Sequence, residues 1–148
     1  MLLECKIKKL KPNAQIPTWA YQSAAGADLY ACLNVPVVEI PPHTTVSIPL
    51  GFSTEFAPGY AALLYARSGM AIKRDISPAN KVGVVDADYR GEWLFPARND
   101  GNEPQFIQDG ERIGQVIFHE VEHPTFVEVD DLSDTERGVG GFGSSGTK

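Results

Sequence analysis

Cysteine is scarce in this sequence, which has two, Cys5 and Cys32, among 148 residues. They stand far apart in the chain and form no metal-type cluster. So few cysteines are typical of a reduced intracellular compartment. The sequence therefore predicts a cytoplasmic protein, or also a nuclear one if the source is eukaryotic.

Long apolar runs are also missing. No stretch approaches the length that crosses a membrane, and residues 1–6 lack the long apolar core of a signal peptide. Basic residues are outnumbered as well, with 13 Lys and Arg against 19 Asp and Glu and a formal net charge of -6. General nucleic-acid binders need a basic surface, so we expect neither a membrane nor a nucleic-acid partner. Any phosphate must be held by a few placed cations, helped by a metal ion.

Helical periodicity is absent from almost the whole chain. The exception is residues 67–73, which predict a helix of barely two turns with Ser68 as its N-cap. Elsewhere, short apolar runs with frequent turn signals predict one all-β domain, a sandwich, jelly roll or barrel. The expected strands cover residues 5–10, 25–31, 35–40, 44–49, 51–56, 60–65, 112–121 and 126–129.

Residues 81–93 are the stretch most suggestive of chemistry. An apolar run ends at Asp86, and after Tyr89 and Gly91 a second apolar run begins at Trp93. Two β-rich runs separated by Asp and Gly predict a β-hairpin. A carboxylate at its tip is expected to be partly desolvated, so Asp86 can act as a general base near neutral pH. The alternative is an ordinary surface turn with solvated aspartates.

Residues 119–123, His-Glu-Val-Glu-His, match the H-E-x-x-H signature of zinc proteases. That motif grips a metal only on a helix, where residues four apart share a face. Apolar residues before it and Pro124 after it indicate a strand, in which the two histidines lie roughly 13 Å apart. We therefore expect the solvated face of an edge strand here and no zinc site.

The start of the predicted helix, Arg67-Ser68-Gly69, suits an anion. Free backbone N–H groups and the helix dipole favour negative charge there, and Arg67 adds a full positive charge. Simple capping beside a surface arginine is the alternative. Asp28 and Gln115, taken alone, favour structural roles at the end of a strand and within one.

Residues 137–146 are rich in glycine and have two interpretations. Composition favours a disordered glycine-serine tail. However, Phe142 stands alone among the glycines and can stack on a planar base. Arg137, Ser144 and Ser145 can hold phosphate oxygens, although no Walker-type P-loop is present.

Taken together, five segments resemble the five sequence motifs of the trimeric dUTP pyrophosphatases (dUTPases). Each motif is weak alone, but five in the right order with natural spacings span nearly the whole chain. The third and fifth are the most specific. The segments are residues 25–31, 66–71, 83–92, 112–118 and 137–146.

The resemblance implies a jelly-roll-like β subunit, with residues 1–130 as its β domain. Residues 131–148 would form a flexible C-terminal arm that closes over the active site. It also implies a homotrimer with three active sites at subunit interfaces, each drawing motifs from all three chains. Such enzymes hydrolyse dUTP to dUMP and pyrophosphate with Mg²⁺, which limits uracil in DNA and supplies dUMP for thymidylate synthesis.

The same resemblance implies roles around the nucleoside. Asp86 would deprotonate the water that attacks the α-phosphorus in line, in a reaction governed by positioning and charge neutralisation. Tyr89 would pack under the deoxyribose and exclude ribonucleotides. Asn80 and the backbone near Gly83 and Val84 would read the uracil edge.

It also implies roles around the phosphates. Arg67, Ser68 and Gly69 would hold the phosphates, while Asp28 and Gln115 would touch waters of a phosphate-bound Mg²⁺. Arm residues would complete the substrate site over the uracil and the γ-phosphate: Arg137, Phe142, Gly143, Ser144 and Ser145.

Some residues depart from the family pattern. Ala66 stands where the family often has proline, Gly69 where it often has a second serine, and Val139 where a small polar residue is common. Pro96 is expected to make the strand after Trp93 locally irregular. Two other functions remain open, a dCTP deaminase-like enzyme of the same fold and a non-catalytic nucleotide-binding or interaction protein.

Overall fold

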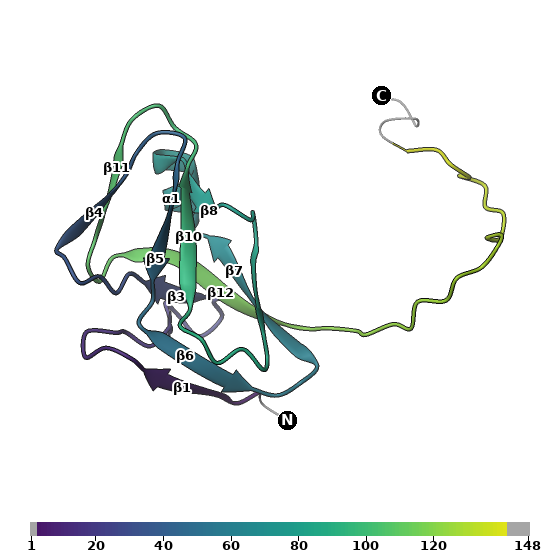
Figure 1. Cartoon of the computed structure of the whole chain (residues 1–148), viewed down its shortest axis with the longest axis horizontal. Coiled ribbons are helices and arrows are strands. Elements are labelled where there is room, and N and C mark those ends of the chain that lie inside the picture. The colour runs from purple at the N-terminus through teal and green to yellow at the C-terminus, as the bar shows by residue number, and fades with distance from the viewer. Residues whose placement is uncertain (1–2, 142–148) are drawn as a thin grey trace.

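Figure 1 shows the computed structural model, which describes residues 3–141. Within them the chain is built from short strands and one short helix, as the sequence predicts. The strands are β1 (Cys5–Lys9), β2 (Thr18–Trp19), β3 (Ala27–Tyr30), β4 (Val37–Ile40), β5 (Thr45–Pro49), β6 (Phe52–Phe56), β7 (Tyr60–Ala66), β8 (Ile76–Pro78), β9 (Gly83–Asp86), β10 (Leu94–Asn99), β11 (Gln105–Gln108) and β12 (Arg112–Glu120), and the helix is α1 (Ser68–Arg74).

The strands pair antiparallel throughout, in four sheets. The largest has the order β2-β3-β12-β7-β9, and the others are β5-β10-β8, β1-β6 and β11-β4. Sequence reasoning found most strands but missed β2, β8 and β11, which have only two to four residues each. Such short strands carry too little alternation for a pattern to detect.

The core lies where β12 faces strands from the smaller sheets. Phe118 on β12 meets Phe56 on β6 edge to face, with ring centroids 5.1 Å apart. Gly114 on β12 lies against the ring of Phe95 from β10, and a Cβ at Gly114 would overlap that ring. Glycine is therefore needed at this position for the two layers to approach.

The predicted hairpin over residues 81–93 is wrong. β9 pairs with β7, whereas β10 pairs with β5 and β8, so the two apolar runs belong to different sheets. The second run is fixed by its long-range partners, since the N–H of Trp93 donates to the carbonyl of Phe52 over 2.9 Å. The segment between them therefore crosses from one layer to the other.

The predicted helix is confirmed, but its N-cap is Arg67 rather than Ser68. Pro96 also differs from expectation, because it lies within regular β10 opposite Ser47. Its carbonyl accepts from Ala79 just beyond β8, whose pairing with β10 reaches only Ala97. The position where Pro96 lacks an N–H faces Ala79, just beyond the end of β8. No hydrogen bond of the β8–β10 pairing is therefore lost.

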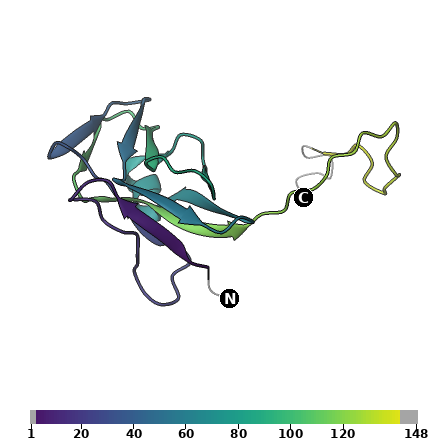
Figure 2. The same cartoon turned by 60° about the horizontal axis from the view of Figure 1, so that its bottom comes forward.

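The strand predicted over residues 126–129 is absent. β12 ends at Glu120, Val121 still donates to the carbonyl of Gly59, and the following described residues run away from the sheets (Figures 1 and 2). Phe126 is 94% exposed and Val127 73% exposed. A β-forming sequence without a neighbouring strand has no ladder to join. Among residues 3–141, no helix is long and apolar enough to cross a membrane.

Candidate active site

Three residues predicted to belong to one site meet at one end of the five-stranded sheet. Gln115 on β12 stands directly opposite Asp28 on β3, so their side chains share a face. Arg67 follows the last residue of β7, which pairs with β12 on its other side. Its Nε lies 2.9 Å from Oδ1 of Asp28. The sheet register thus brings the first, second and fourth motifs together.

Asp28 is only 9% exposed and holds two arginines. Besides Arg67, it accepts from Arg112, whose Nη1 lies 3.2 Å from Oδ2. Two guanidinium groups around one carboxylate leave the cluster with a net positive charge, which suits an anion. Sequence reasoning missed Arg112 as a site residue, although its place at the head of the fourth motif was a signal.

Gln115 is oriented by its backbone neighbours. Its Nε2 donates to the carbonyl of Ala66 over 2.9 Å. A Cβ on Gly26 would lie 2.7 Å from Oε1, so a side chain at that position would force the amide to shift. The orientation turns the amide nitrogen toward β7 and leaves Oε1 as an acceptor for a bound water.

The beginning of α1 offers further donors. Ser68 and Gly69 are exposed, and α1 has neither a side-chain cap nor an acidic residue in its first turn. The first N–H groups of a helix lack intrahelical partners. The Cβ position of Gly69 faces open space, so the family's usual serine would fit there without strain.

A second group of predicted residues lies on the crossing segment after β9. Tyr89 donates its backbone N–H to the carbonyl of Asp86 over 3.2 Å, which closes a turn. Arg90 locks this turn, since its Nη1 donates to Ala87 O at 2.8 Å and to Thr54 O at 3.2 Å. Sequence reasoning missed this role of Arg90. The expectation that Asp86 is partly desolvated is wrong for the single chain, where Asp86 is exposed.

Asp86 lines a hollow of about 930 Å³ beside β1 and β6. Lys6 and Glu55 form an ion pair of 2.7 Å in its wall. The hydrogen bond and charge of Lys6 lower the pKa of Glu55, so this carboxylate stays ionised at neutral pH. The carboxylates of Glu55 and Asp86 therefore share the hollow with the cations Lys6 and Arg90.

The residues predicted to read a base lie at the start of β9. Gly83 is buried against Leu64, and its Cβ position lies 3.7 Å from Nδ2 of Asn80. Val84, next along β9, is 60% exposed. This brings Asn80, Gly83 and Val84 together, as the sequence predicts.

The two groups lie at opposite ends of β7. Asp86 pairs with Ala61, whereas Ala66 immediately precedes Arg67. Five residues of strand span about 17 Å, more than the two side chains bridge toward one reacting atom. The single chain therefore does not bring Asp86 together with Asp28, Arg67 and Gln115.

The strand context inferred for the H-E-x-x-H sequence is confirmed only for His119 and Glu120, the last residues of β12, whereas residues 121–123 lie beyond the strand. His119 interacts with Tyr65 at 3.3 Å, and Glu120 accepts from Tyr60 at 3.1 Å. That contact with Glu120 raises the pKa of Tyr60. Within residues 3–141, no group of three His, Cys, Asp or Glu side chains could hold a metal ion.

Of the substrate-site residues predicted in the arm, only Arg137 lies within the described part of the chain. Its Nε donates to the carbonyl of Gly140 over 2.6 Å. Gly138, with φ of +52°, donates to the carbonyl of Thr135 and bends the chain there. The remaining arm residues, Phe142, Gly143, Ser144 and Ser145, lie outside the described residues.

Comparison with known proteins matches the family model described as dUTPase to residues 12–146. The deoxyuridine 5'-triphosphate nucleotidohydrolase of Hahella chejuensis is 43% identical over 149 residues, covering 100% of this chain and 97% of the relative. That of Desulfitobacterium hafniense is 44% identical over 133 residues, covering 89% of this chain and 87% of the relative. A mutant dUTPase of Staphylococcus bacteriophage 80alpha, solved with dUpNHpp, superposes with a TM-score of 0.87 at 25% identity, covering 97% of this chain and 99% of the other.

The fold is the jelly roll of a class of nucleotide hydrolases. Both the family match and the full-length relatives cover nearly all of this sequence. The chain belongs to the dUTPase family, and it is an enzyme of the dUTP diphosphatase class.

Proposed function

We propose that the protein hydrolyses dUTP to dUMP and pyrophosphate by in-line attack of water on the α-phosphorus, with Mg²⁺. In the cell, most simply the cytoplasm, this would limit uracil in DNA and supply dUMP for thymidylate synthesis. The observation that carries the proposal is the meeting of Asp28, Arg67 and Gln115 from three separate segments. A cation-rich cluster around one buried carboxylate is suited to a polyphosphate.

Asp86 is the proposed base. It accepts a proton from the attacking water and points that water at the phosphorus, which is the part a carboxylate can play in phosphoryl transfer. Its support is the rigid turn around it, held by the backbone of Tyr89 and the guanidinium of Arg90. A fixed base loses little orientational freedom on the way to the transition state.

Tyr89 and the start of β9 supply the proposed specificity. The Tyr89 ring packs under deoxyribose and leaves no space for a 2′-hydroxyl. Asn80 and the β9 backbone near Gly83 and Val84 pair with the uracil edge, so cytosine meets mismatched donors. Thymine is excluded because the buried backbone at Gly83 leaves no room for a 5-methyl group.

The residues at the other end of β7 fit a metal held mainly by phosphate. Both oxygens of Asp28 are engaged by arginines, so it cannot serve as an open inner ligand. Gln115 Oε1 and the edge of Asp28 are suited to the ion's waters, which is how Mg²⁺ is commonly held. Bound in this way, the metal would neutralise phosphate charge. Arg67, Ser68 and Gly69 bind the phosphates directly.

The proposed working unit is a homotrimer with shared sites, because one chain separates its two halves by about 17 Å. Exposed apolar side chains on the outgoing segment, residues 121–141 after β12, also favour a partner. Among residues 3–141, β1 pairs only with β6, and it lies beside an apolar pocket of about 430 Å³. A neighbouring copy can cover these surfaces; the exposed side chains are Phe126, Val127, Val129 and Leu132.

A panel of nucleoside triphosphates tests the proposed function. We expect pyrophosphate release from dUTP to exceed that from UTP, dTTP and dCTP by at least about a hundredfold in kcat/KM, because each competitor leaves a mismatch or a clash in the pocket. Ammonia is measured in parallel. Release of ammonia from dCTP would favour the deaminase-like alternative, and binding of dUTP without any product would favour a non-catalytic protein.

Removing residues 137–148 tests the proposed arm. The truncated protein should fold and assemble, because β12 and the sheets end before residue 121. Its kcat/KM for dUTP should fall about a hundredfold, since the phosphates lose positioning contacts. The matched control removes only residues 147–148, beyond the fifth motif. Full activity of the longer truncation would show that the arm has no part in catalysis.

A further inference from the structure

We propose that Glu92 is a positioning residue that sets the preference for deoxyribose over ribose by fixing the ring of Tyr89. This inference rests on the proposed function, in which Tyr89 packs against the sugar. Glu92 follows the crossing segment and precedes the buried Trp93.

The Tyr89 ring is placed by Gly91 and Glu92, which follow it two and three positions later in the chain. Its hydroxyl donates to the backbone carbonyl of Glu92 over 3.2 Å. Gly91 lies directly beneath the ring, and a Cβ on Gly91 would overlap it. The ring is half-exposed and makes no other side-chain hydrogen bond within the described residues. Its position therefore depends on where the backbone of residues 91–92 lies.

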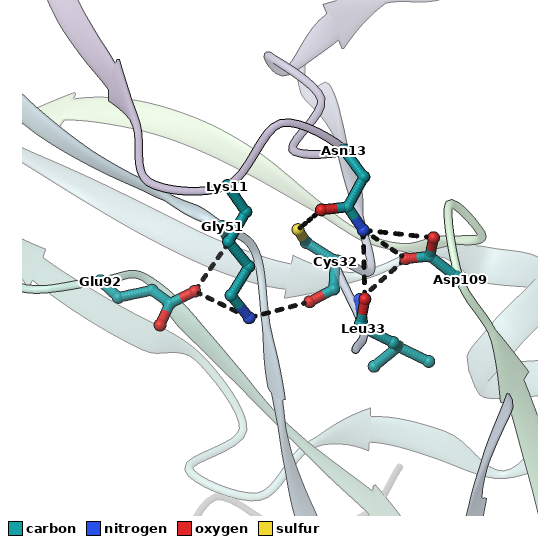
Figure 3. Close-up of polar contacts among 7 residues, drawn as sticks. All are labelled: Lys11, Asn13, Cys32, Leu33, Gly51, Glu92 and Asp109. Carbon is teal, nitrogen blue, oxygen red and sulfur yellow. Dashed lines mark hydrogen bonds and ion pairs between the residues drawn. The ribbon is translucent and has the colours of Figure 1, made fainter. Parts of the chain in front are cut away.

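The side chain of Glu92 ties that backbone to the body of the protein. Its Oε1 accepts from the N–H of Gly51 over 3.1 Å and lies 3.9 Å from Nζ of Lys11 (Figure 3). Gly51 joins β5 to β6 with φ of +78°, and a Cβ there would lie 2.7 Å from Cβ of Ala14. Its carbonyl accepts from Leu10 over 2.7 Å. Gly51 is thus a rigid anchor.

The anchor is itself part of a wider polar network. Lys11 also donates to the carbonyl of Cys32 over 3.5 Å. Nearby, Asn13 donates to Leu33 O at 3.1 Å, and Asp109 accepts from Leu33 N at 2.8 Å (Figure 3). Segments far apart in the sequence are held together at this point. Glu92 therefore connects the turn that carries Tyr89 to the junction between β5 and β6, which is held by its own backbone hydrogen bond and close packing.

The test compares dUTP with UTP for Glu92→Ala and Glu92→Gln. Glu92→Ala should reduce the kcat/KM preference for dUTP about tenfold, mostly through KM, because the tyrosine ring loses its fixed position. Glu92→Gln keeps the acceptor for Gly51 and should stay within about twofold of the wild type. Glu39→Ala, an exposed glutamate on β4, is the matched control and should leave the preference unchanged.

Tyr89→Phe keeps the inference testable if Glu92→Ala does not fold. It removes only the hydroxyl that reaches the Glu92 carbonyl, and it should also reduce the preference. The double variant should lose less than the sum of the two, since both changes act on one ring. An unchanged preference in Tyr89→Phe, or in a folded Glu92→Ala, overturns the inference. A wild type that does not distinguish UTP from dUTP overturns the proposed function instead.

Discussion

Asp86→Asn is expected to lower dUTP turnover roughly a thousandfold, because the amide keeps the shape of the carboxylate but cannot take the proton of the attacking water. dUTP should still bind, since the contacts that fix the turn come from the backbone of Tyr89 and the guanidinium of Arg90. Pyrophosphate release measures turnover, and calorimetric titration measures binding.

Asp88→Asn is the matched control for this experiment. Asp88 lies two residues further along the same turn and is also exposed. Its replacement removes the same charge from the same hollow, so a purely electrostatic effect would appear in both variants. Turnover within about threefold of the wild type is expected for a group that transfers no proton. Equal losses of turnover in the two variants would show that Asp86 is not the base.

Local pattern was enough to predict the short helix and most of the strands. Alternating apolar residues identify β5, because Val46 and Ile48 point to the more buried face and period-two burial is a property of the strand itself. Pairing is not local, and the hairpin error shows why. β9 and β10 lie close in sequence, yet each pairs with strands elsewhere in the chain, and the buried Trp93 and Phe95 pack with distant residues.

The candidate site shows the same difference between local pattern and long-range pairing. Asp28, Arg67 and Gln115 were recognised as separate motifs, and sheet register then brings them together. Arg112 was missed because its role depends on the neighbouring strand. It stands opposite Tyr30 and reaches Asp28, two residues before Tyr30. The desolvation expected for Asp86 is not a property of one chain, since Asp86 is exposed there. Desolvation of this carboxylate would come from bound substrate, from the arm or, in the proposed trimer, from another subunit.

The outgoing segment gives a similar lesson. Residues 126–129 have the composition of a strand but none of the hydrogen-bonding partners in the described part of their own chain. A β pattern indicates that a segment can pair, and says nothing of which chain supplies the partner. The correct local signal and the wrong structural prediction are therefore compatible if the working unit has more than one chain.

Mixing two inactive variants is expected to restore activity, because in the proposed homotrimer the two halves of the site come from different chains. Asp86→Asn and Arg67→Ala are each expected to be inactive alone. After subunit exchange in a one-to-one mixture, about a quarter of the sites should receive an intact Asp86 from one chain and an intact Arg67 from another. The recovered rate of dUTP hydrolysis, with native mass spectrometry to follow exchange, measures this.

The matched control mixes Asp28→Asn with Arg67→Ala. These two residues form an ion pair of 2.9 Å within one chain, so no chain in that mixture carries an intact pair. Exchange should then restore no activity, although it proceeds equally well. Recovery in the control would mean that the pair is shared between chains. If the mixture of Asp86→Asn and Arg67→Ala recovers no dUTP hydrolysis after full exchange, Asp86 and Arg67 serve one site from a single chain. That result would contradict the separation of about 17 Å along β7.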